Sequence, residues 1–288
     1  MFEDGTLHIL RSNPLTAAAV RVAGPWLTRS VRGFVFVAST GRSGTQTLQR
    51  LFDALPGCVA LHEPYPIMNG AVLRAFNDGD DAAARRVFRR SKLPLIYLAA
   101  RGRRWYAETN HLFVKSFAAA AVDALGPRMQ VVHLTREPEA VAASCLHRGY
   151  VPGTPEGDDW WIAPRASRNH IRLNDELAAS GRFPHPYFRC LWYCYELEAR
   201  TREFAANYPQ VPIHRMHTEQ LGHVAEVRRL FDALGMPFTA AVAARVGTRA
   251  NASLQRPRLP AEVQRSEVDA FHAICRERLE AQLAPRTR

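Results

Sequence analysis

Short apolar runs alternate along the chain with segments that repeat apolar residues every three or four positions. The runs predict β-strands over residues 33–39, 57–61, 111–115, 129–135 and 211–216. The periodic segments predict helices near residues 43–55, 80–92, 117–125, 137–147, 188–207 and 224–234. Near-continuous apolar strands joined by helical crossovers are typical of a parallel sheet with helices on both faces. The pattern therefore predicts a three-layer α/β fold with a mostly parallel central sheet.

Two segments interrupt this alternation. Residues 64–106 are rich in arginine and are predicted to be mostly helical, whereas residues 150–187 carry several prolines and two adjacent tryptophans. We interpret both as insertions beside the ligand-binding edge of the sheet, with 150–187 on the acceptor side. An amphipathic helix is predicted near residues 261–283. We expect residues 1–288 to form one domain with a core of about 33–237.

The charge balance favours anionic ligands. Lysine and arginine total 38 against 27 acidic residues, which gives a net charge of +11. The charge is dispersed and no known nucleic-acid-binding signature occurs, so we expect no nucleic-acid partner. The five scattered cysteines suit a reducing compartment. No run of 18 apolar residues occurs, and residues 15–31 lack the features of a signal peptide, so we expect a cytoplasmic protein without a membrane span.

The most informative chemistry follows the first predicted strand. The turn into the next helix reads Ser39-Thr40-Gly41-Arg42-Ser43-Gly44-Thr45-Gln46-Thr47. A small-residue turn of this kind directs backbone N–H groups at one point, where the helix dipole adds positive potential. Arg42 contributes a full charge and a bidentate donor. The loop predicts a binding site for a phosphorylated ligand.

The loop differs from two common nucleotide-binding motifs. A Walker A loop places lysine directly after its second glycine, whereas Gly44 is followed by Thr45, and Arg42 precedes Gly44 by two positions. Gly41 and Gly44 also lack the three-glycine spacing of the dinucleotide fingerprint. A purely structural interpretation is a tight turn whose helix is capped by Ser43 or Thr45.

A second phosphate grip is predicted after the fourth strand. The apolar run 129–135 ends at Arg136, and a helix with acidic residues in its first turn follows. Ser144 lies eight residues beyond Arg136, about two turns into that helix. An arginine at a strand end and a helical hydroxyl can hold one phosphate together. Alternatively, Arg136 pairs with Glu137 or Glu139.

Together, these motifs resemble those of the sulfotransferases that use 3′-phosphoadenosine 5′-phosphosulfate (PAPS), which have a P-loop NTPase-like fold. The run Arg42-Ser43-Gly44-Thr45 resembles the family's 5′-phosphosulfate loop, and Arg136 with Ser144 resembles its 3′-phosphate motif. The loop is closest in character to carbohydrate, tyrosylprotein and bacterial sulfotransferases. Gln46 departs from the family pattern, which has a second threonine there; Thr47 is the neighbouring hydroxyl.

The resemblance implies transfer of the sulfuryl group from PAPS to an acceptor hydroxyl or amine, with release of adenosine 3′,5′-bisphosphate (PAP) and without a required metal. It implies a small-molecule or glycan acceptor, whose identity stays open, as does the oligomeric state. The nucleotide-binding residues it implies are Arg42, Ser43, Gly44, Thr45, Gln46, Thr47, Arg136, Ser144 and, in a late basic loop, Arg249.

The candidate general base is Glu63, which follows the second predicted strand. Several sulfotransferases of carbohydrates and of tyrosine place a catalytic glutamate at a comparable point. His62 is the alternative base, because its intrinsic pKa suits the task better. Lys115, predicted to end the third strand, is a candidate to steady the sulfonate or contact the acceptor, and Glu108 is predicted to line the same pocket. The structural alternative for Glu63 and His62 is a helix cap or a surface ion pair.

Two other functions fit the same loop. An ATP-using P-loop kinase-like transferase needs an aspartate at a strand end to organise Mg²⁺, but here that strand ends at Arg136. A non-catalytic binder of nucleotides or polyanions would keep the fold without a base, which Glu63 argues against.

Overall fold

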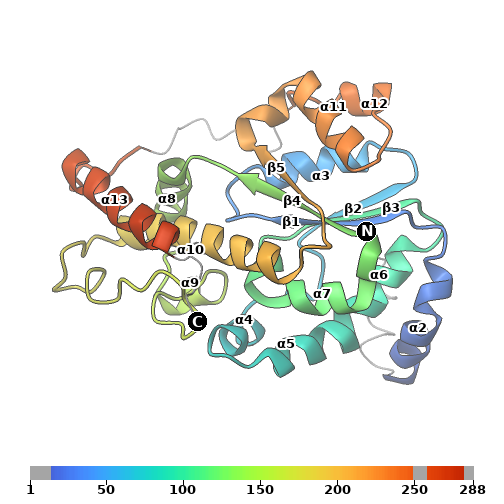
Figure 1. Ribbon diagram of the computed structural model, residues 1–288, viewed down its shortest axis with the longest axis horizontal. Helices are drawn as coiled ribbons and strands as arrows, with labels where there is room; N and C mark the ends of the chain where they lie inside the picture. The colour runs from blue at the N-terminus through green and yellow to red at the C-terminus, as the bar shows by residue number, and fades with distance from the viewer. Residues whose placement is uncertain (1–13, 249–257, 282–288) are drawn as a thin grey trace.

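The computed structural model describes residues 14–248 and 258–281 (Figure 1). Its strands are β1 (Gly33–Ala38), β2 (Cys58–His62), β3 (Trp105–Thr109), β4 (Met129–Thr135) and β5 (Ile213–His217). They form one sheet in the order β2-β3-β1-β4-β5, and every neighbouring pair is parallel. The predicted α/β fold with a parallel central sheet is confirmed.

Helices cover both faces of the sheet (Figure 1). The longer ones are α2 (Pro14–Leu27), α3 (Thr45–Asp53), α6 (Leu93–Ala100), α7 (Ala118–Leu125), α8 (Pro138–His147), α10 (Pro186–Asn207), α11 (Val224–Ala233) and α13 (Arg265–Ala281). Shorter ones are α4 (Ala71–Asn77), α5 (Asp81–Val87), α9 (Pro155–Asp158) and α12 (Ala240–Ala243). Single turns of π- or 3₁₀-helix are η1 (Phe88–Lys92), η2 (Phe113–Phe117), η3 (Gly126–Arg128) and η4 (Thr218–Gly222).

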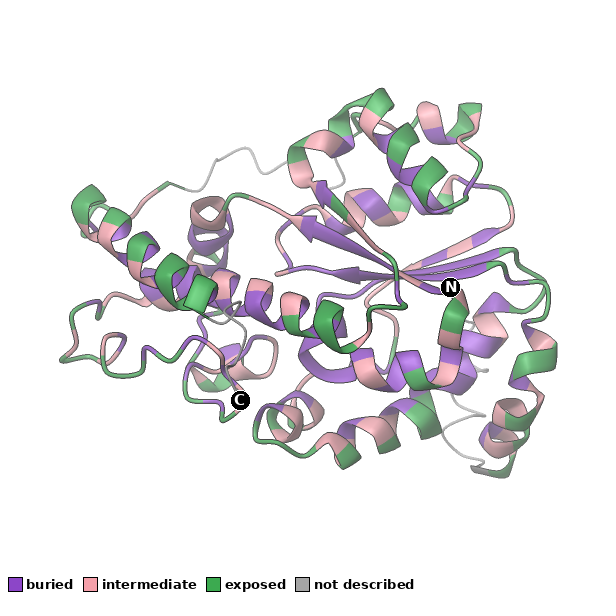
Figure 2. Ribbon diagram, viewed as in Figure 1, coloured by how far each residue is buried: buried purple, intermediate pink, exposed green. Residues whose placement is uncertain are grey.

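Strand β1 shows why the sheet lies in the middle of the molecule. All six of its residues are buried (Figure 2). Because side chains alternate across a strand, Phe34 and Phe36 face one core and Val35 and Val37 face the other. The phenylalanine face packs against helices that include α6, α7 and α10, and the valine face packs against α3 and α11. Burial on both faces therefore fixes β1, and the loop that follows it, at the centre.

The third strand is not where the sequence pattern predicted it. The prediction of a strand at 111–115 is wrong: strand β3 is Trp105–Thr109, and Phe113–Phe117 is a π-helical turn. Every residue from 105 to 118 is buried, so no alternation of polar and apolar positions marks the strand. The segment 64–106 is mostly helical as predicted, but its last two residues already belong to β3.

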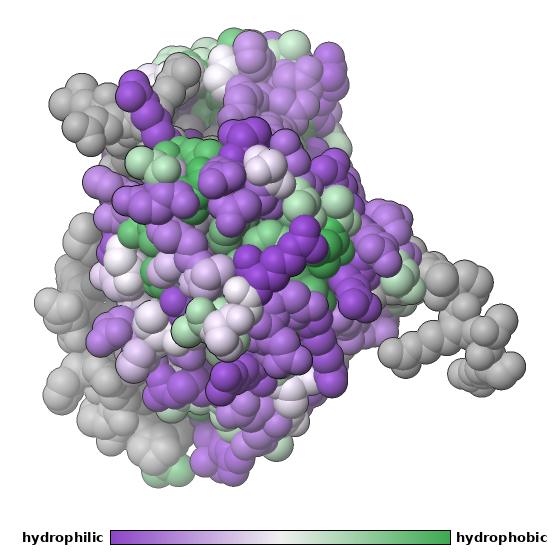
Figure 3. Space-filling view, turned by 90° about the vertical axis from the view of Figure 1, so that its left-hand side faces the viewer, coloured by the Kyte–Doolittle hydropathy of each residue, from purple (hydrophilic) through white to green (hydrophobic). Residues whose placement is uncertain are grey.

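The carboxyl ends of the parallel strands meet at one edge of the sheet, as in other open α/β folds. The molecular surface on this side is largely hydrophilic (Figure 3). None of the helices within the described ranges has the length and apolar content that crossing a bilayer requires.

Candidate active site

The loop after β1 has the backbone shape of an anion cradle. Gly41, Arg42 and Gly44 all have positive φ angles, of 74°, 57° and 86°. Helix α3 then begins at Thr45, and its N-cap residue, Gly44, makes no side-chain cap hydrogen bond. The first N–H groups of a helix have no partner within the helix, so a helix N-terminus of this kind is suited to an anion.

Hydrogen bonds from three parts of the chain hold this loop. The Ser39 hydroxyl accepts from the N–H of Gly41 at 2.9 Å and shares a hydrogen bond with the Ser43 hydroxyl at 2.7 Å. The Tyr193 hydroxyl donates to the Thr40 carbonyl at 2.8 Å, and the Thr218 hydroxyl donates to the Ser43 carbonyl at 2.6 Å. The Ser43 side chain is thus buried inside the loop and does not line the cavity, contrary to a ligand-facing role for its hydroxyl.

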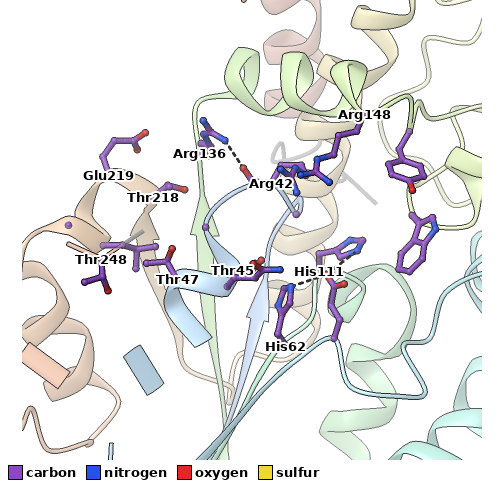
Figure 4. Close-up of a pocket in the computed structure, with 18 of the residues that line it drawn as sticks. Arg42, Thr45, Thr47, His62, His111, Arg136, Arg148, Thr218, Glu219 and Thr248 are labelled. Atoms are coloured by element: carbon purple, nitrogen blue, oxygen red, sulfur yellow. Dashed lines mark hydrogen bonds and ion pairs between the residues drawn. The ribbon is translucent and has the colours of Figure 1, made fainter. Parts of the chain in front are cut away.

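Three arginines surround a cavity of about 490 Å³ beside the loop (Figure 4). They are Arg42 from the loop, Arg136 just after β4, and Arg148 just after α8. Arg136 Nη1 donates to the Arg42 carbonyl at 2.7 Å, and Arg42 Nε donates to the Ser144 hydroxyl at 3.1 Å. Arg42, predicted to bind the 5′-phosphosulfate, is therefore in direct contact with Arg136 and Ser144, predicted to bind the 3′-phosphate. The contacts lie where the neighbouring strands β1 and β4 end.

These arginines are not neutralised by acidic side chains of the described residues. Within residues 14–248 and 258–281, no ion pair joins Arg42, Arg136 or Arg148 to a carboxylate. Partial burial, together with repulsion from Arg148 and Arg136, lowers the pKa of Arg42. The alternative pairing of Arg136 with Glu137 or Glu139 is absent, and Glu139 pairs with Arg265 instead. The cluster is a strongly positive site suited to a polyanion.

Glu63 lies at the far side of the same cavity, after β2. Its φ angle is +46°, and its Oε1 lies 3.8 Å from His62 Nε2 and 3.5 Å from His111 Nε2. His62 Nδ1 lies 3.0 Å from both the carbonyl and the hydroxyl of Thr109. These contacts hold the His62 ring with Nε2 toward Glu63.

A buried ion pair fastens the segment that follows Glu63. Lys92 Nζ lies 2.8 Å from Glu108 Oε1, and both side chains are almost fully buried. The same ammonium donates to the carbonyls of Pro64 and Pro66, at 3.1 and 2.9 Å. The prediction that Glu108 lines the pocket is wrong, because strand β3 ends one residue later and points this carboxylate into the core.

Lys115 and Ser144 lie behind the cavity surface. Lys115 belongs to η2 rather than to a strand end, and its side chain is completely buried. Lys115 contacts His111, which lines the cavity, but Lys115 itself is not among the lining residues. Its position therefore does not support the predicted direct contact with the sulfonate or the acceptor. Ser144 reaches the site through its hydrogen bond with Arg42.

The remaining predicted loop residues lie where expected. Gly44, Thr45, Gln46 and Thr47 all line the cavity. Arg249 lies outside the described residues. Several residues that line the cavity were not predicted from the sequence: His111, Arg148, Tyr150, Thr218, Glu219 and Thr248. Placing the third strand correctly would have put His111 at a carboxyl strand end and identified it.

Comparison with solved structures gives the fold. The sulfotransferase STF9 from Mycobacterium avium aligns with a TM-score of 0.50 at 16% identity, over 92% of this chain and 81% of that one. Sulfotransferase STF1 from Mycobacterium tuberculosis aligns at 0.48 and 15% identity (95% and 84% covered), and mouse SULT7A1 complexed with PAP aligns at 0.48 and 13% identity (92% and 90% covered). No protein-family model and no curated protein sequence matches the chain. The STF9 alignment shows that the chain has the sulfotransferase fold, as the resemblance implied.

Proposed function

We propose that the protein is a sulfotransferase that uses PAPS to sulfonate a hydroxyl or amine. The observation that carries this proposal is the convergence of Arg42, Arg136 and Arg148 on one cavity without a paired carboxylate among the described residues. Such a cluster, beside the N-terminus of helix α3, suits a ligand with more than one phosphate-like group. PAPS carries a 5′-phosphosulfate and a 3′-phosphate, and the sulfotransferase fold is consistent with this ligand.

We assign the 5′-phosphosulfate to the loop and the 3′-phosphate to the other side of the cluster. Arg42 and the N–H groups of residues 43–46 would face the bridging oxygen, where negative charge grows as the sulfur–oxygen bond breaks. Fixed donors at that point stabilise the transition state, and losing one typically costs about 3–4 kcal/mol. Arg136 would hold the 3′-phosphate together with Ser144, whose hydroxyl accepts from Arg42 Nε in the structure and would turn to the 3′-phosphate when the nucleotide binds. Arg249 stays a proposed contact.

We assign the first proton transfer to Glu63. Its carboxylate faces the cavity and lies within 4 Å of two imidazole rings. A proton leaving the acceptor oxygen would pass to Glu63 as the oxygen attacks sulfur in line, and His62, whose Nε2 lies 3.8 Å from Glu63 Oε1, is the alternative base.

A kinase-like reaction suits the site less well. In P-loop NTPases a strand-end aspartate helps to hold Mg²⁺. Here β4 is followed by Arg136, whose charge would repel a cation at that position. A non-catalytic nucleotide binder has no use for Glu63, whose strained positive φ angle is a conformation that surrounding structure must enforce.

The acceptor is proposed to enter beside the aromatic side chains of the 150–187 segment. Tyr150, Trp160 and Trp161 line the cavity. Flat aromatic faces suit a sugar ring or another small organic acceptor. We further propose that residues 1–288 act as one catalytic domain in a reducing, cytoplasmic setting, since all five cysteines are buried free thiols.

Transfer of labelled sulfate from PAPS to a panel of sugars, phenols, lipid-linked glycans and peptides tests the proposal. We expect transfer to at least one class, a loss of about 100-fold or more in kcat for Arg42→Ala, and a severe loss for Glu63→Gln. An Arg42→Ala or Glu63→Gln protein that sulfonated the identified acceptor at the full rate would remove the proposed mechanism.

A further inference from the structure

A completely buried lysine that forms no ion pair within the described residues lies directly behind the site. Lys115 Nζ has three hydrogen-bonding neighbours: the Trp160 carbonyl at 2.8 Å, the Tyr193 hydroxyl at 2.9 Å and His111 Nδ1 at 2.6 Å. Among the ion pairs of the described part of the chain, none includes Lys115. Burial of an ammonium away from a carboxylate is costly, so the neutral amine is strongly favoured relative to a surface lysine.

Two of the three neighbours can only accept a hydrogen bond from Lys115. The Trp160 carbonyl has no proton, and the Tyr193 hydroxyl spends its own proton on the Thr40 carbonyl at 2.8 Å. A neutral amine has two N–H donors and one lone pair. Its two N–H groups can donate to the Trp160 carbonyl and to the Tyr193 hydroxyl. Its lone pair then accepts a hydrogen bond from the Nδ1–H group of His111.

The state of Lys115 therefore fixes the protonation of His111. With a neutral amine, Nδ1 of His111 carries the proton and Nε2 is bare. With an ammonium, all three N–H groups donate, Nδ1 becomes the acceptor, and the ring proton sits on Nε2. His111 Nε2 lies 3.5 Å from Glu63 Oε1, and catalytic hydrogen bonds are often this long before a substrate binds.

We propose that His111 and Lys115 form a proton relay behind Glu63, in which Lys115 is the final store of the proton released by the acceptor. This inference rests on the proposed function. In the relay, the acceptor O–H bond breaks and its electron pair forms the new bond to sulfur, while the bond from sulfur to the bridging oxygen of the 5′-phosphate breaks and PAP leaves with that electron pair. The proton of the acceptor goes to Glu63. That proton then moves to Nε2 of His111, while the proton on Nδ1 moves to the amine of Lys115.

Over the whole relay, Glu63, His111 and Lys115 together gain one proton. Before transfer they are a Glu63 carboxylate, a neutral His111 protonated on Nδ1 and a Lys115 amine; afterwards they are a carboxylate, a neutral His111 protonated on Nε2 and a Lys115 ammonium. The rings of Trp161 and Tyr193 lie 4.9 and 5.2 Å from Nζ, and their faces stabilise the ammonium once it forms. Lys115 is thus a positioning residue, acting through His111.

Charged groups from several elements surround the relay. Burial sets the pKa of both Lys115 and His111 well below the usual values, and the charge of Lys115 lowers the pKa of His111 further. The other titratable groups that act on the pair are Glu63 and His62 beside β2, Arg42 in the loop, Cys145 on α8 and Arg200 on α10. Only Glu63 is a carboxylate, and it lies on the cavity side of His111.

Nitrogen-15 NMR of histidine-labelled protein tests the relay without any ligand, with the His111 signals assigned from the spectrum of a His111→Gln variant. As pH rises, we expect Nε2 of His111 to lose its proton while Nδ1 gains one, with a single midpoint. An ordinary histidine changes at only one nitrogen. In Lys115→Met we expect an ordinary single-nitrogen titration. Ser116→Ala is the matched control and should keep the opposite movement, because the Ser116 hydroxyl only bonds to the Leu112 carbonyl of its own turn.

A wild-type His111 that kept one tautomer throughout the pH range of the folded protein would overturn the relay, as would an unchanged pattern in Lys115→Met. The wild-type titration needs no variant, so the test stands even if Lys115→Met fails to fold. Calorimetry with PAP on the same sample separates the two proposals. Opposite nitrogen movements without PAP binding would remove the sulfotransferase assignment alone, whereas PAP binding with a fixed tautomer would remove the relay alone.

Discussion

Replacing Lys92 by methionine removes the cation that links the core of the sheet to the segment after Glu63. The Glu108 carboxylate is fully buried and receives three donors: Lys92 Nζ at 2.8 Å, the Tyr106 hydroxyl at 2.7 Å and Asn110 Nδ2 at 3.0 Å. In Lys92→Met only the two neutral donors remain. Breaking a buried ion pair by removing one member costs about 3–5 kcal/mol, because the other charge is left uncompensated.

Lys92→Met also removes a hydrogen bond that Lys92 donates to the segment after Glu63. The Pro66 carbonyl accepts from Lys92 in a buried setting, and a buried acceptor left without a donor costs about 1–3 kcal/mol. The double variant Lys92→Met, Glu108→Gln removes the unpaired charge but not this second loss. We therefore expect the double variant to recover most of the lost stability and to stay about 1–3 kcal/mol below the wild type.

Urea unfolding monitored by tryptophan fluorescence measures these differences, and kcat for sulfonation measures the effect on Glu63. We expect kcat to stay low in both variants, because the carbonyls of Pro64 and Pro66 have lost their donor in each. A double variant no more stable than the single one would refute the charge argument. Full turnover in both variants would refute the idea that Lys92 positions the Glu63 segment.

Three further changes probe the site. Gly41→Ala should weaken PAP binding, measured by calorimetry, because its Cβ would lie 3.2 Å from Trp161 and 3.3 Å from His111 at a φ of +74°; unchanged affinity would show that the loop tolerates another shape. Ser144→Ala should weaken PAP binding by about tenfold or more, since a hydrogen bond to a charged group contributes about 1.5–3 kcal/mol, while adenosine 5′-phosphate binding changes less; equal losses would contradict the 3′-phosphate assignment. Because the pKa of Lys115 is lower in the folded than in the unfolded chain, the unfolded chain binds more protons. The wild type should therefore gain stability over Lys115→Met as pH rises from that lowered pKa to about 10.4, which paired urea titrations would check; a constant difference would contradict it.

The features that the sequence predicted well are those with strong local signals. Strand β4 is Met129–Thr135, as predicted, because its apolar run is bounded by a proline turn and by Arg136. The loop at 39–47 was identified because small residues, a cation and a helix start occur together, and the positive φ angles of Gly41 and Gly44 explain the glycines.

The features that it missed depend on long-range packing. Lys115 and Glu108 are charged residues that were predicted to line the pocket, yet both are completely buried. Glu108 is buried because Lys92, 16 positions earlier, reaches it from η1. Lys115 is buried because Tyr193 and Trp160 close over it from distant segments. No local pattern encodes such partners, so the hydrogen-bonded network behind Glu63 became visible only in three dimensions.

The central claim is that Arg42, Arg136 and their neighbours form a site for a nucleotide with phosphate groups at both the 3′ and 5′ ends. Calorimetric titration of the wild type and of Arg136→Ala with PAP and with ATP tests it most directly. We predict that the wild type binds PAP at least tenfold more tightly than ATP, and that Arg136→Ala loses about 1.5–3 kcal/mol of PAP binding, roughly 10- to 150-fold, and with it this preference. Equal affinity for ATP and PAP, unchanged by Arg136→Ala, would contradict the account.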